Sequence, residues 1–125
     1  MARFKKVHQK YHPDVLFLEP SEMVLTKETR DVTAMGQRDI RYVNGPVVTL
    51  VDGPGFAFNW QERGPLLRGQ IMGADLVAVS RADLLDEDEL YAVEQELAEL
   101  SEGIFRLSLP RQWGVPQILA ALASE

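Results

Sequence analysis

The stretch Asp75-Leu-Val-Ala-Val-Ser80-Arg81-Ala82-Asp83-Leu84 decides the fold of this chain. Its apolar run, 76–79, is short and uninterrupted, which is typical of a strand buried on both faces in a parallel sheet. The polar residues that follow end the run in a turn. The stretch therefore predicts a central parallel strand with a polar turn at its carboxyl end.

Similar apolar runs elsewhere in the chain predict three more strands and the helices between them. The strands are expected at Val15–Leu18, Val47–Val51 and Ile104–Leu109. Possible capping boxes at Asn59-x-x-Glu62 and Asp86-x-x-Glu89 predict two helix starts. The first of these helices should run to about Met72, and the second should bury Leu90, Val93, Leu97 and Leu100. Further helices are expected over Arg3–Tyr11, Thr26–Gln37 and Val115–Ala123, the last with an apolar stripe of Ile118, Leu119 and Leu122.

Strands that alternate with helices indicate the α/β class. We expect a three-layer arrangement with a mostly parallel four-stranded sheet flanked by helices. At 125 residues the chain suits a single domain over 1–125 with one hydrophobic core.

Composition excludes several classes of partner and site. The net charge of -6 argues against a nucleic-acid-binding surface, which needs a basic face. The absence of cysteine excludes disulfides and thiolate metal sites within the chain, and it suits a cytoplasmic protein. No apolar run approaches the roughly 20 residues that span a bilayer, so no membrane partner is expected.

Polar residues follow each of the four predicted strands. They are Glu19, Asp52, Ser80 through Asp83, and Ser108. Because the carboxyl ends of parallel strands lie along the same edge of a sheet, these residues are expected to share one site. The alternative is that they are simply the polar residues with which loops begin.

Four segments together resemble the later part of a P-loop GTPase of the CobW type, a metallochaperone group that also includes the hydrogenase and urease nickel-insertion GTPases. The first is Pro13-Asp-Val-Leu-Phe-Leu-Glu19-Pro-Ser21-Glu22, and the second is Val47-Val-Thr-Leu-Val-Asp52. The third, Gln70-Ile-Met-Gly-Ala-Asp75-Leu-Val-Ala-Val-Ser80-Arg81-Ala82-Asp83, is similar to the family's guanine-specificity motif. The fourth comprises Ile104-Phe-Arg-Leu-Ser108 and Gly114-Val115-Pro-Gln-Ile-Leu119. Together they cover nearly the whole chain in the family's order.

The resemblance implies a partial P-loop NTPase fold that binds GTP or GDP with magnesium. Asp83, Arg81 and Ser80 would recognise the guanine, with Ser108 nearby. Glu19 would be the Walker-B-like acid, with both the catalytic and the metal-binding role. The physiological task would be metal or cofactor delivery to a metalloenzyme client.

Asp52-Gly-Pro-Gly55 also fits the D-x-x-G switch pattern of GTPases. Only one helix and one strand fit between Asp52 and Ser80, however, so the spacing of Glu19 suits the family layout better. Asp52 is therefore expected at the margin of the site, where it touches nucleotide or metal, or serves the turn alone.

Three departures from the family pattern limit what this chain is expected to do. It contains no G-x-x-x-x-G-K-[ST] loop, which grips the phosphates in such enzymes. Ser80-Arg81 replaces the family's Asn-Lys, and Glu22 stands where the family has glycine. The chain is thus not expected to hydrolyse GTP alone.

Several partners remain open after these departures. A second polypeptide that carries the P-loop half, self-association, or direct pairing of the first two strands would each compensate for the missing part of the sheet. The alternative function is a non-catalytic, GTPase-derived scaffold that self-associates. His8 and His12 have the spacing of two metal ligands on a helix, but solvated or capping histidines are the simpler interpretation.

Overall fold

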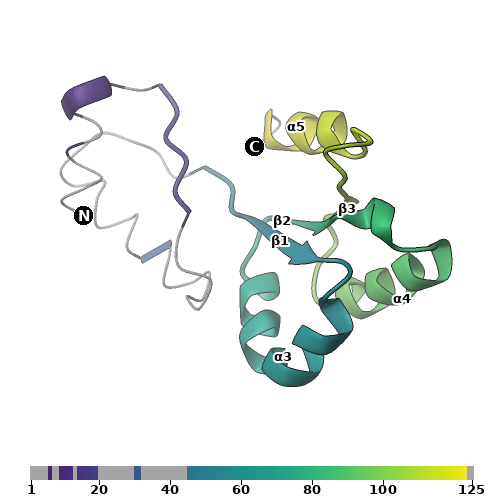
Figure 1. Ribbon diagram of the computed structural model, residues 1–125. Helices are drawn as coiled ribbons and strands as arrows, with labels where there is room; N and C mark the ends of the chain where they lie inside the picture. Colours follow the sequence, from purple (N-terminus) through teal and green to yellow (C-terminus); the bar gives the residue numbers. More distant parts are fainter. Residues whose placement is uncertain (1–5, 7–8, 13, 20–29, 32–44, 124–125) are drawn as a thin grey trace. The chain divides into compact units, whose positions relative to one another are not determined.

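A computed structural model describes residues 6, 9–12, 14–19, 30–31 and 45–123. It divides the chain into two units, Met1–Gly45 and Pro46–Glu125, and each is described by itself (Figure 1). In the first unit, residues 9–11 are helical and residues 14–19 form neither helix nor strand. The assignment of both units to one domain stays a prediction.

The second unit is built on a parallel three-stranded sheet. Its strands are β1 (Val48–Asp52), β2 (Leu76–Ser80) and β3 (Ile104–Arg106), in the order β1-β2-β3. The apolar residues 76–79 of β2 are all buried, because this strand is central and both of its faces are covered. The predicted α/β class with a parallel sheet is therefore confirmed.

Two strand predictions differ from the structure. The strand expected at Val15–Leu18 is not confirmed, since residues 14–19 contain no strand. A short apolar run does not by itself distinguish a strand from another conformation, and a strand also requires a neighbour with which to pair. The third strand, β3, ends at Arg106 rather than Leu109, because Ser108 pairs in a short bridge with Trp113.

Helix α3 (Phe56–Met72) begins earlier than the sequence predicts. Gly55 is its N-cap, and the amide N–H of Asn59 donates to the Gly55 carbonyl at 3.0 Å. Asn59 thus lies within the first turn and does not begin the helix. The helix kinks at Arg63, just before Pro65, because proline lacks an N–H and crowds the preceding turn.

Helix α4 (Glu87–Ala98) begins as predicted. The Asp86 carboxylate accepts from the Glu89 amide at 2.8 Å, and the Glu89 carboxylate accepts from the Asp86 amide at 3.0 Å. This reciprocal capping box follows the short 3-10 helix η1 (Ala82–Leu84). The predicted core residues Leu90, Val93 and Leu97 are buried, and Leu100 packs against the core as a partly buried residue.

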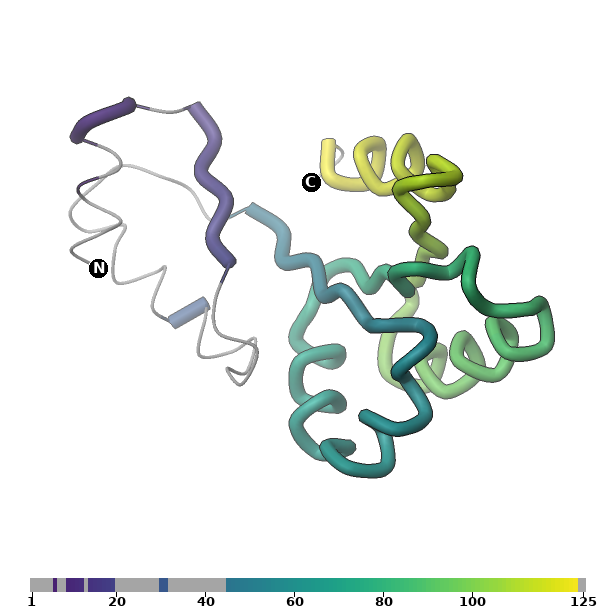
Figure 2. Tube along the Cα trace, viewed as in Figure 1, coloured from purple at the N-terminus to yellow at the C-terminus, as the bar shows by residue number. Residues whose placement is uncertain are grey.

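Helices α3 and α4 lie on one side of the sheet, and α5 (Val115–Ala123) lies on the other (Figure 1). The tube in Figure 2 follows the chain from β1 through α3 to β2, and then through α4 to β3. The core under α3 and α4 contains Val51, Val77, Val79, Ile71, Leu90 and Leu97. The predicted bounds of α5 are confirmed, but none of its residues is buried, and its expected apolar stripe therefore adds no fully buried side chain.

Arg106 joins β3 to α4. Its Nη2 donates to Glu94 at 2.8 Å, its Nε donates to the other Glu94 oxygen at 3.2 Å, and its Nη1 donates to Glu87 at 2.9 Å. The hydrogen bonds to Glu94, and then those to Glu87, raise the pKa of the guanidinium above its ordinary value. This ion-pair cluster fixes the edge strand to the helix that covers it.

Gly114 connects the end of β3 to α5 in a left-handed conformation, with φ +78°. A Cβ at this position would overlap the backbone carbonyl oxygen of Arg106. The turn that leads into α5 therefore requires glycine for both its backbone angle and its close approach to β3.

Asp75 sets the register with which β1 and β2 begin. Its carboxylate accepts from the Val47 amide at 2.7 Å, and its own amide donates to the Val47 carbonyl at 2.8 Å. We expect Asp75→Ala to lower the free energy of unfolding by about 1 kcal/mol, because the charged acceptor is lost at an exposed position. Urea unfolding measures this effect, with the exposed Asp88→Ala as the control. Equal stabilities of the two variants would refute this role of Asp75.

Candidate functional site

The loops at the carboxyl edge of the sheet are held together by backbone hydrogen bonds. The Gly53 amide, after β1, donates to the Ser80 carbonyl at 3.0 Å. The Ala82 amide, after β2, donates to the Leu107 carbonyl at 3.1 Å. The exits of all three strands are thereby joined, and Asp52, Ser80 through Asp83, and Ser108 lie along this edge.

Gly53 is buried where the exit of β1 meets β2. A Cβ at this position would lie 2.9 Å from the Ser80 carbonyl oxygen, closer than side chains ordinarily approach. The Gly53 carbonyl accepts from the Phe56 amide at 3.2 Å, which turns the chain into α3. Turn chemistry therefore accounts for the glycine that follows Asp52.

Arg81 and Asp52 form an ion pair across the first two strand exits. The Nε of Arg81 donates to Asp52 Oδ1 at 3.0 Å, and Nη2 donates to the same oxygen. Arg81 adopts a left-handed backbone, with φ +53°, which is uncommon for a residue with a side chain. The two side chains retain 59% and 36% of their exposure, so the pair is accessible from solvent.

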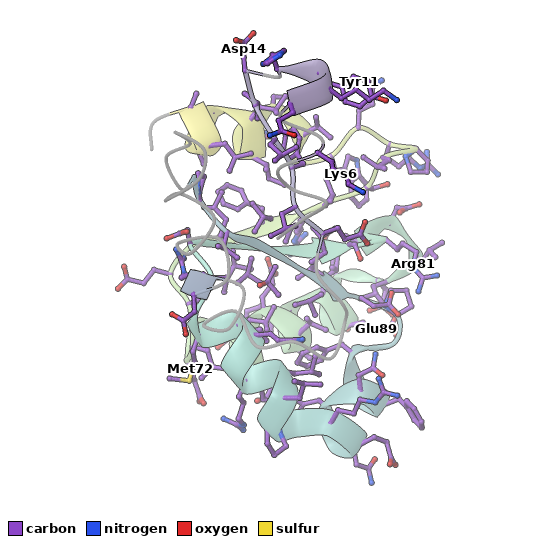
Figure 3. The ribbon with its side chains drawn as sticks, turned by 90° about the vertical axis from the view of Figure 1, so that its left-hand side faces the viewer. Lys6, Tyr11, Asp14, Met72, Arg81 and Glu89 are labelled. Carbon is purple, nitrogen blue, oxygen red and sulfur yellow. The ribbon has the colours of Figure 1, made fainter. Side chains whose placement is uncertain are left out.

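The pairing of Arg81 with Asp52 was not predicted from the sequence. The available signal was the presence of opposite charges at the exits of consecutive predicted strands, which neighbouring parallel strands bring together. Figure 3 shows Arg81 projecting from one edge of the second unit and Met72 at the opposite edge. The carboxyl edge therefore holds an oriented guanidinium.

The two predicted serines have roles in the backbone structure. The Ser80 hydroxyl donates to the Val51 carbonyl at 3.2 Å. Ser108 is 1% exposed, and its hydroxyl oxygen accepts from the Arg111 amide at 3.3 Å. Both hydroxyls stabilise the edge on which the charged residues stand, and Ser108 is too deeply buried to reach a ligand.

Among the predicted site residues of the second unit, Asp83 offers the carboxylate that no described residue engages, whereas Asp52 is paired with Arg81. Asp83 is half-buried at the centre of η1, where the Leu85 amide donates to the Ala82 carbonyl at 3.2 Å. Its carboxylate has no hydrogen bond or ion pair with any residue that the structure describes. A carboxylate in this state can accept two hydrogen bonds from a ligand that presents adjacent N–H groups.

Glu19 lies in the first unit, so its predicted place beside magnesium stays a prediction. His8 lies outside the described residues. Within residues 45–123 and the described parts of the first unit, no group of three or more metal-binding side chains could hold an ion. Magnesium in nucleotide sites is commonly held by one or two carboxylates together with substrate phosphates, so this finding leaves the predicted role of Glu19 untested.

Among the helices that the structure describes, none has both the length and the apolar character needed to cross a membrane. Comparison with known proteins finds no matching family model, no matching curated protein and no matching solved structure.

Proposed function

We propose that residues 46–125 form the guanine-recognising half of a CobW-like GTPase domain. The observation that carries this proposal is the half-buried Asp83, whose carboxylate has no partner among the described residues, in the turn after the central parallel strand. The sequence resemblance assigns this position to recognition of the base. Ligands of open parallel sheets commonly bind at this edge.

The chemistry of guanine suits a single carboxylate. Its N1–H and its exocyclic amine are adjacent donors, and the two oxygens of Asp83 can accept one bond from each. Adenine presents an acceptor at N1, so the carboxylate would face a lone pair there. A site built for two donors rejects an analogue that lacks them, because its polar group is then left unpaired.

The phosphate half of the site would come from a P-loop partner, which is either another polypeptide or a segment outside residues 1–125. Phosphoryl transfer requires backbone N–H groups, a lysine and a magnesium-binding hydroxyl from the P-loop, and that motif is absent from this sequence. With such a partner the chain would contribute to a cytoplasmic GTPase that delivers a metal or cofactor to a metalloenzyme. That task rests on the resemblance alone.

Replacing Asp83 tests the proposal directly. We expect Asp83→Ala to weaken GDP binding at least ~10-fold, because two charge-assisted hydrogen bonds are lost. Isothermal titration of GDP and of ADP into the purified chain measures the loss and the base preference. Asp88→Ala, an exposed acidic residue of α4, is the matched control and should bind like the unaltered protein. Equal affinity for GDP and ADP would contradict the proposal.

A second candidate function is a scaffold that self-associates. Leu50 on the edge strand β1 is 62% exposed, and Leu119 on α5 is 59% exposed. In the described sheet β1 pairs only with β2, so its other edge offers unpaired backbone groups to another strand. Sedimentation equilibrium distinguishes the candidates. A stable oligomer without guanine binding favours the scaffold, and guanine binding by a monomer excludes it.

A further inference from the structure

We propose that Asp52 is a positioning residue that orients Arg81 for contact with the base. This inference rests on the proposed guanine-binding function. Both donors of Arg81 in the pair, Nε and Nη2, lie on one edge of the guanidinium and converge on Asp52 Oδ1. The flat faces of the guanidinium are not used by these two bonds, and a guanidinium face can stack on an aromatic ring.

The backbone at Arg81 supports a role beyond a surface ion pair. The residue takes φ +53°. For a non-glycine residue, this left-handed conformation is populated roughly 5- to 30-fold less than the ordinary right-handed one. An exposed ion pair of this kind raises the population of the conformation that forms it by only about 1.5- to 5-fold, which does not offset that cost. The hydrogen bonds from Ala82 to Leu107 and from Leu84 to Arg81 hold the rest of the turn in place. Strained residues that the surrounding structure retains in this way concentrate at binding sites.

The arrangement divides base recognition between two side chains of one turn. Asp83 supplies acceptors for the edge of the base, while Arg81, two residues earlier, supplies a planar cation for its face. Asp52 fixes that cation before ligand arrives, so less side-chain freedom is lost on binding. Asp52 thus acts through Arg81 and does not itself touch the base.

A double-mutant cycle in the full chain tests this coupling. Asp52→Asn should weaken GDP binding roughly 3- to 10-fold, the cost of ordering one long side chain on binding. In an Arg81→Ala background the same substitution should have no further effect. Equal effects in both backgrounds, or tighter binding by Asp52→Asn, would overturn the proposal.

A second readout requires no nucleotide. Nitrogen-15 relaxation of the Arg81 Nε–H should show an ordered side chain in the unaltered protein and a mobile one in Asp52→Asn, with the exposed Arg111 as a mobile reference. If Arg81 is as mobile as Arg111 in the unaltered protein, the positioning role fails while binding through Asp83 can still be measured. If Arg81 is ordered but no variant binds GDP, the guanine-binding function fails, and the inference that depends on it fails too.

Discussion

Replacing Gly114 with alanine is expected to lower the free energy of unfolding by about 3 kcal/mol or more. Two costs combine at this residue. The backbone has φ +78°, which disfavours any residue with a Cβ. The new methyl would also overlap the Arg106 carbonyl oxygen and lie 3.6 Å from the Leu107 Cα. These are backbone atoms, so relief requires a shift of the chain after β3.

Urea unfolding followed by far-UV circular dichroism measures this loss. Gly45→Ala provides the matched control, because no atom lies within 4 Å of a Cβ built there. That variant should remain within about 0.5 kcal/mol of the unaltered protein. If Gly114→Ala unfolds at the same urea concentration as Gly45→Ala, the turn does not require glycine.

Arg106→Met is expected to cost about 2 kcal/mol of stability. Methionine retains part of the apolar stem but removes the N–H groups of Arg106 that donate hydrogen bonds to Glu94 and Glu87. Glu94 is 27% exposed, so its unpaired charge would be poorly compensated by water. The remaining solvent access keeps the loss below that of a fully buried pair.

Two variants separate the contributions to this cluster. Glu87→Ala should cost no more than about 0.5 kcal/mol, because that side chain is 80% exposed. The stability of Arg106→Lys should lie between that of Arg106→Met and that of the unaltered protein, since an ammonium group cannot form the planar fork. Equal losses for Glu87→Ala and Arg106→Met would show that Glu94 does not dominate the cluster.

The parts of the fold that local sequence determines were predicted well. The capping residues Asp86 and Glu89 fixed the start of α4, and its regular apolar spacing identified the buried face. The uninterrupted apolar run of β2 required a position covered on both sides, which the central strand provides. In both cases the residues that determine the structure lie close together in the sequence.

Features that depend on tertiary contacts were not predictable in the same way. Gly55 caps α3 without a side chain, so the polar pattern at Asn59 indicated an N-cap four residues too late. Strand topology alone placed Asp52, Ser80 through Asp83, and Ser108 at the carboxyl edge, whereas Glu19 follows a segment in which the structure has no strand. The individual roles of the site residues depend on partners distant in sequence, as the contact of Arg81 with Asp52 shows.

The main-chain bonds that join the strand exits also bear on how this region can change during evolution. Gly53 and Ala82 donate through amides to the carbonyls of Ser80 and Leu107, and the residue type at an acceptor position scarcely matters to such a bond. Substitutions of loop residues can therefore alter ligand preference while the backbone hydrogen bonds between the strand exits are retained.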